Sequence, residues 1–161
     1  MRYSLAAVVA FAAYATAAPV FTTQQYDDIS ISGGTAGNAE EEALAVFSAL
    51  DQSDLANADP ADVDFLKSVN SIANDAETDA FNPAIEAASG EEADALQRGK
   101  IKNKVLKLEA TMLALKIQQA QGDDVADKIA AEQKKLNNNI KQDQDEAGNP
   151  STALTFSAST A

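Results

Sequence analysis

The sequence of 161 residues contains no cysteine, no histidine and no tryptophan. Without histidine and cysteine, the chain lacks the side chains of serine–histidine and cysteine–histidine nucleophile systems and the usual ligands of transition metals. Without cysteine it also lacks the disulfides with which small secreted proteins often stabilise a thin core. Its fold must therefore depend on the packing of apolar side chains.

Carboxylates are the remaining groups for acid–base chemistry, and their pattern does not indicate an active site. Asp62 with Asp64, and the acidic residues of 143–146, are typical of solvated helix faces and helix ends, and no tryptophan is available to stack on a sugar between two catalytic carboxylates. The sequence has no calcium loop of the EF-hand type, and Gly33-Gly34 lacks the lysine and the spacing of a phosphate-binding loop. We therefore predict that the protein is not an enzyme and has no catalytic residues, no metal site and no cofactor.

The first 17 residues have the pattern of a secretory signal peptide. Arg2 precedes an apolar run from Leu5 to Ala15, which is shorter than the ~20 residues that span a bilayer, and the small residues before position 18 suit cleavage. The alternative is a buried N-terminal helix. The C-terminal residues lack the hydrophobic tail of a lipid-anchor signal. We expect cleavage after Ala17 and a soluble, secreted, extracellular product without a transmembrane span, either free or associated with a cell wall.

Acidic and basic residues are unevenly distributed along the chain. Residues 18–95 carry a single basic side chain, Lys67, against 17 carboxylates, whereas residues 96–161 carry 10 basic and 8 acidic side chains. The basic residues that open the second part either pack beside acidic helices of the first part or form an exposed strip that binds an anionic partner. Nucleic acid is not expected as that partner, because a net charge of −13 would repel phosphate at long range. The candidate partner-facing strip consists of Arg98, Lys100, Lys102, Lys104 and Lys107.

Residues 89–145 predict two long antiparallel helices joined by a short turn. In the first helix, apolar residues at spacings of three and four form two stripes on nearly opposite sides. A helix that is apolar on two sides is normally covered on two sides, so we expect this one to be central. One stripe comprises Ile101, Val105, Leu108, Met112 and Leu115, and the other comprises Leu106, Ala110, Leu113 and Ile117.

Residues at the helix ends and one internal glycine add detail to this hairpin. Ser89 with Glu92 matches a capping box at the start of the first helix. Gly122 is suited to end that helix, and the aspartates of 123–124 are suited to cap the next one. Gly99 inside the first helix indicates either a close approach of another backbone or a break near the helix start.

Shorter helices are predicted before the hairpin. Asn38 suggests a capped start for a short helix, and Asp59-Pro60 is a strong start signal for a longer one. Asn82-Pro83 repeats that signal, so we expect the chain to break there and a short helix to follow over residues 83–88. The predicted fold is all-α, an antiparallel helical bundle of about four helices over residues 38–147.

The segments on either side of the predicted bundle are extended. Residues 18–37 include the alternating run Ile29-Ser30-Ile31-Ser32, and residues 148–161 include Leu154-Thr155-Phe156, which alternates in the same way. The two segments either pair as a small two-stranded ribbon or remain loose tails, because an isolated ribbon is marginally stable.

Several stretches of the chain resemble a cysteine-free family of fungal small secreted proteins. They are Ala18-Pro19 with Thr22-Thr23, residues 26–34 with 36–39, and residues 95–108. The resemblance covers most of the chain after the predicted signal peptide and implies a fungal extracellular protein. The family has no established activity, so the resemblance implies no catalytic or binding residue. In size and helical content the chain is also similar to the fungal hydrophobic-surface-binding and cell-wall mannoprotein family, although no specific motif is shared.

Two functions are compatible with these patterns. The first is a secreted, non-catalytic protein with an interaction or surface-associated role, whose partner is an unknown protein, cell-wall or host component. The alternative is a carrier that binds an apolar, fatty-acid-like ligand within the bundle, where the two-sided stripe of the central helix would line the space.

Overall fold

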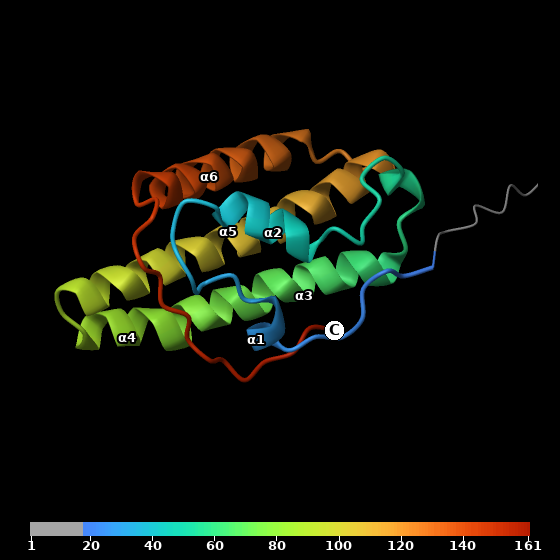
Figure 1. Cartoon of the computed structure of the whole chain (residues 1–161). Coiled ribbons are helices and arrows are strands. Elements are labelled where there is room, and N and C mark those ends of the chain that lie inside the picture. Colours follow the sequence, from blue (N-terminus) through green and yellow to red (C-terminus); the bar gives the residue numbers. More distant parts are fainter. Residues whose placement is uncertain (1–17) are drawn as a thin grey trace, which may run out of the picture.

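The fold is all-α, as predicted, and its longest helix lies in the middle. A computed structural model describes residues 18–161, and the predicted signal peptide lies outside the described residues. In Figure 1, α5 lies between α6 and α3, and α2 packs across α5 on the side seen in this view. The elements are α1 (Tyr26–Ile29), α2 (Ala39–Val46), the 3-10 helix η1 (Leu55–Asn57), α3 (Pro60–Ala76), the π-helical turn η2 (Glu77–Phe81), α4 (Asn82–Ala87), α5 (Glu91–Ala120) and α6 (Ala126–Asp145).

The two apolar stripes of α5 are covered as expected. All nine stripe residues are buried except Leu115, which is partly exposed. The α3 side chains Phe65 and Val69 and the α6 side chains Leu136 and Ile140 belong to the same buried core. A helix flanked on both sides in this way loses apolar surface along two faces, which provides a core without disulfides.

The α3 helix continues into α4 without the predicted break. Asp59 caps α3 as expected, since its side chain accepts a 2.8 Å hydrogen bond from the backbone N–H of Ala61. The predicted break at Asn82-Pro83 is wrong, because the wider turn of η2 carries the chain from α3 directly into α4. Pro83 is the second residue of α4 and directly follows the π-helical turn.

The other predicted caps are not formed by neighbouring side chains. Gly90, with φ of +59°, precedes α5, and no side chain caps this helix, so the predicted Ser89–Glu92 capping box is wrong. Neither α2 nor α6 has a local side-chain cap. At α2, the carboxylate of Asp143 from α6 accepts the N–H of Ala39 at 2.9 Å instead. The prediction for Gly122 is confirmed, since it follows the end of α5 with φ of +104°.

The N- and C-terminal segments meet at two isolated antiparallel bridges, Gln25 with Ser159 and Thr35 with Pro150. Residues 18–161 contain no continuous strand pair. The reason is local, because the predicted alternating run begins inside α1, whose single turn buries Tyr26 and Ile29.

The C-terminal segment also explains the glycine inside α5. The N–H of Thr152 donates to the carbonyl of Ala95 at 3.0 Å, and a Cβ at Gly99 would collide with the carbonyl oxygen of Thr152. Gly99 therefore marks the close approach of another backbone, one of the two outcomes predicted for it.

None of the helices within residues 18–161 combines the length and the apolar character needed to cross a bilayer.

Candidate functional site: a polar groove over α5

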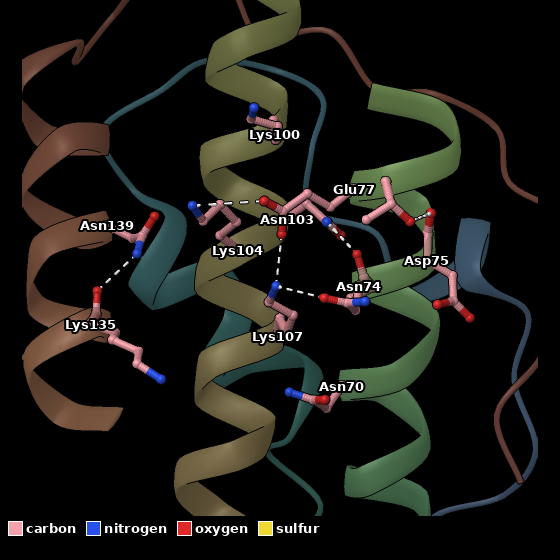
Figure 2. Close-up of polar contacts among 12 residues, drawn as sticks. Asn70, Asn74, Asp75, Glu77, Lys100, Asn103, Lys104, Lys107, Lys135 and Asn139 are labelled. Atoms are coloured by element: carbon pink, nitrogen blue, oxygen red, sulfur yellow. Dashed lines mark hydrogen bonds and ion pairs between the residues drawn. The ribbon is translucent and has the colours of Figure 1, made fainter. Parts of the chain in front are cut away.

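A groove with a volume of about 610 Å³ runs along α5 between α3 and α6. Figure 2 shows this region with α6, α5 and α3 side by side. Nearly all of the lining side chains are polar. They are Asn70 and Asn74 from α3, Lys104, Lys107, Leu108 and Thr111 from α5, and Glu132, Lys135, Asn138 and Asn139 from α6. We call this set the amide–lysine groove.

Helical spacing brings these side chains to one face. Asn70 and Asn74 are one turn apart on α3, and Lys104, Leu108 and Thr111 follow the same spacing on α5. The buried stripes hold α3 and α6 against α5, so the polar rows between the stripes face the groove. The same amphipathic pattern that builds the core therefore also builds the groove.

The two lysines of α5 share one carboxylate. Nζ of Lys107 donates to Oε2 of Glu77 at 2.7 Å and to Oδ1 of Asn74 at 3.3 Å. Nζ of Lys104 lies 3.8 Å from the other oxygen of Glu77, which is too far for a hydrogen bond. Glu77 is the first residue of η2, and π-helical turns are frequent at functional sites.

The amide of Asn70 is held in place by the floor of the groove. Its Nδ2 donates to Oγ1 of Thr111 at 2.7 Å, and that hydroxyl donates to the carbonyl of Lys107 at 2.9 Å. Asn70 contacts the floor through its Nδ2, so its carbonyl oxygen is available as an acceptor.

The α6 wall contains a buried acceptor without a partner. Asn139 is 5% exposed, and its Nδ2 donates to the carbonyl of Lys135 at 2.8 Å. Its Oδ1 has no hydrogen-bond partner among the described residues. Nζ of Lys135 pairs with Glu132 at 2.7 Å. In Figure 2, Asn139 lies on the side of α6 that faces α5. An unsatisfied buried acceptor is rare in a native fold, and the carboxylate oxygen Oδ1 of Asp143, one turn further along α6, is a second one.

Two members of the predicted basic strip are buried and do not face solvent. Arg98 is 5% exposed and contacts Glu91, Glu146 and the carbonyl of Pro150. Lys102 is completely buried; its Nζ lies 2.7 Å from a carboxylate oxygen of Glu42 and donates to the carbonyls of residues 33 and 35. Their burial contradicts an exposed strip of five residues, and it agrees with the interpretation that this flank packs against the acidic first part of the chain.

The other three strip residues are partly exposed. Lys104 and Lys107 line the amide–lysine groove, whereas Lys100 lies outside it and donates to Oδ1 of Asn82 at 3.1 Å. Their role in binding a partner stays a prediction.

The asparagines of the groove were missed by the sequence reasoning, which searched for charged and catalytic residue types. The signal was present in the one-turn spacing of Asn70 and Asn74 and in the run Asn137-Asn138-Asn139. Amides combine a donor and an acceptor, and ammonium groups attract anions, so the groove suits the recognition of a polar ligand.

No curated protein and no solved structure matches the chain. Residues 21–155, which include every side chain of the amide–lysine groove, match the model of a family described as a domain of unknown function, DUF8454, and the chain belongs to this family.

Proposed function

We propose that the protein is a secreted, non-catalytic fungal small protein that binds a partner at a cell surface or from a host through the amide–lysine groove. The observation that carries this proposal is the groove itself, a hollow of about 610 Å³ in which amides, lysines and a hydroxyl converge from three helices. A concave surface with a few converging polar groups is the usual form of a binding site. The signal-like leader and the resemblance to fungal small secreted proteins support the extracellular setting.

The scaffold in this proposal is an antiparallel bundle of about four helices. Side chains on packed helices keep their positions better than side chains on loops, because their backbones are fixed by the core. The N- and C-terminal segments, which meet at two bridges, act as a strap around one side of the bundle.

A pull-down with secreted protein tests the binding role. The variant Lys104→Gln/Lys107→Gln changes two groove lysines, and Lys128→Gln/Lys134→Gln makes the same change of charge at exposed α6 positions outside the groove. Capture of a partner from culture filtrate or host extract should be lost with the groove variant and retained with the control. Equal capture by both variants, at unchanged thermal stability, would reject the groove as the binding surface.

Analysis of the medium tests the extracellular setting. The mature protein should begin at Ala18, which N-terminal sequencing and intact mass measurement would show. A chain retained in the cells with residues 1–17 attached would contradict secretion.

The second candidate function is that of a carrier for an apolar ligand. It is favoured by a hollow of about 290 Å³ beside Ala114 and Leu115, where the one partly exposed residue of the two stripes lies. The other stripe residues are buried and leave little surface for a ligand. Native mass spectrometry and a displacement assay on the secreted protein test this candidate. A protein mass without added ligand, together with no displacement of a fluorescent fatty acid, would reject the carrier function.

A further inference from the structure

We infer that the amide–lysine groove binds a hydroxylated carboxylate, with an oligosaccharide that carries a single uronic acid as its chemical class. This inference rests on the proposed function and specifies its ligand. It follows from the charge balance of the groove, from the hydrogen-bonding groups that its walls present and from the shortage of apolar surface in it.

The charge balance of the groove leaves one positive charge uncompensated. Three ammonium groups, those of Lys104, Lys107 and Lys135, converge there, and two carboxylates, Glu77 and Glu132, lie within 4 Å of them. Lys107 and Lys135 each make a 2.7 Å contact with a carboxylate. One carboxylate of a ligand would therefore balance the groove, whereas a dianionic phosphate would overcompensate it beside two glutamates.

Lys104 is the anchor for that carboxylate. Its side chain is 34% exposed, and its only ion pair among residues 18–161 is the 3.8 Å contact with Glu77. Its ammonium hydrogens are therefore free to donate to a ligand that enters the groove. Figure 2 shows Lys104 on α5, between Asn139 of α6 and the α3 side of the groove. A ligand carboxylate at Lys104 would reach both walls.

The walls present amide groups that match hydroxyls. Asn70 donates through Nδ2 to Thr111 and so has its carbonyl oxygen free to accept from a ligand, whereas Asn74 accepts from Lys107 and has its Nδ2 free to donate. The exposed Asn138 can do both. A sugar hydroxyl both donates and accepts, so neighbouring hydroxyls can pair with such amides.

An acidic peptide is a poorer match for this groove. Peptide segments gain much of their affinity from apolar side chains in pockets, and Leu108 is the only large apolar side chain that lines the groove. The other lining residues are polar, so ligand hydroxyls match them better than apolar side chains do.

Isothermal titration and ¹⁵N-resolved NMR of the secreted protein test the inference with three probes. A trisaccharide of one glucuronic acid on xylobiose carries one carboxylate and several hydroxyls, its methyl ester keeps the hydroxyls without the charge, and an end-blocked tripeptide with one glutamate keeps the charge without the hydroxyls. The acidic trisaccharide should bind at least about tenfold more tightly than either of the other two, because a hydrogen bond to a charged group contributes more than a neutral one. It should also shift the side-chain amide signals of Asn70, Asn74 and Asn138.

Two variants complete the test. Lys104→Gln should reduce the affinity for the acidic trisaccharide to that for its ester, whereas Lys100→Gln, one turn away on the same helix and outside the groove, should leave it unchanged. Equal affinity for acid and ester, no effect of Lys104→Gln, or tighter binding of the tripeptide would each overturn the inference. If no probe binds while partner capture still depends on the groove, the ligand class is rejected and the proposed function stands. If capture does not depend on the groove, the proposed function itself is rejected.

Discussion

The hydroxyl of Tyr26 donates a 2.8 Å hydrogen bond to Oδ1 of Asn103, and Nδ2 of Asn103 donates at 2.8 Å to the carbonyl of Ala73. Tyr26 and Asn103 are completely buried. One amide on α5 thus joins the N-terminal segment at α1 to the main helix α3. A buried polar group that is fully satisfied in this way fixes the position of the elements it links.

We expect Tyr26→Phe to lower the free energy of unfolding by about 1–3 kcal/mol, because it leaves Oδ1 of Asn103 buried without a donor. Urea denaturation measures the change. An unchanged free energy of unfolding would show that the amide finds another donor.

The ionisation of Tyr26 gives a second measurement of the same contact. Burial is the main cause that raises the pKa of Tyr26 above 10.0, and Asp27 adds a smaller repulsion. The neutral phenol therefore stabilises the fold below pH 10.0, and this contribution is lost as the pH rises through the folded pKa. Tyr26 is the only tyrosine after residue 17, so tyrosinate absorbance of a chain that begins at Ala18 reports on it alone. It should ionise above pH 10.0, and reversible ionisation at the ordinary pKa of tyrosine in the folded state would contradict its burial.

Lys102→Met should destabilise the protein by about 3 kcal/mol or more, because removing one partner of a buried ion pair leaves the others unpaired. The ammonium of Lys102 holds Glu42 and two backbone carbonyls of the N-terminal segment. Lys100→Met is the matched control, since Lys100 is partly exposed and makes one side-chain contact, with Asn82. The control should cost less than about 1 kcal/mol. Thermal or urea unfolding of both variants checks the difference, and equal costs would contradict the role given to Lys102.

Gly99→Ala should destabilise the protein, although the same change inside an ordinary helix stabilises by about 1 kcal/mol. The added methyl group would collide with the carbonyl of Thr152. In a chain that ends at Pro150 the collision with Thr152 is absent and only a 3.1 Å contact with the Phe81 ring remains, so there the substitution should cost clearly less. Unfolding measurements on the four chains of this cycle test the difference. An equal cost in both backgrounds would show that the C-terminal segment does not press against Gly99.

Glu109→Gln should stabilise the protein at neutral pH. Burial is the main cause that raises the pKa of Glu109 above 4.5; Lys116 lowers it and Glu40 raises it further. The protonated carboxyl therefore favours the fold below pH 4.5, and this contribution is lost as the pH rises through the folded pKa. Melting temperatures at pH 7 and pH 4.5 measure the effect, which should be larger at pH 7.

Glu86→Gln is the control for this comparison, because Glu86 is exposed on α4. Its melting temperature should follow that of the unmodified protein at both pH values. A gain in the control as large as that in Glu109→Gln would mean that the effect comes from net charge and not from burial.

The helices and the central place of α5 could be predicted from the sequence, because both are properties of local spacing. The stripes that contain Val105 and Leu106 are read directly from the order of residues. The start of α3 was equally clear, since Asp59 and Pro60 act on their own neighbours. Such short-range patterns determine which segments are helical and which face of each is apolar.

Features that depend on partners far along the chain could not be predicted in this way. The cap of α2 comes from Asp143, which is more than 100 residues away, so no local pattern predicts it. The burial of Lys102 depends on carbonyls of the N-terminal segment that pass over α5. The groove likewise depends on which polar rows of three helices meet, whereas the sequence shows only that each row exists.

Hydrogen bonds join the two ends of the described chain to each other. The backbone N–H of Thr160 donates to the carbonyl of Gln24, the N–H of Gln24 donates to the hydroxyl of Thr160, and Thr160 is 4% exposed. At the N-terminal end, a buried carboxylate oxygen of Asp62 accepts the N–H groups of Val20 and Phe21. An exopeptidase that trims residues 18–161 from either end must therefore first detach a docked segment, so these contacts give the two ends resistance to trimming that other proteins obtain from disulfides.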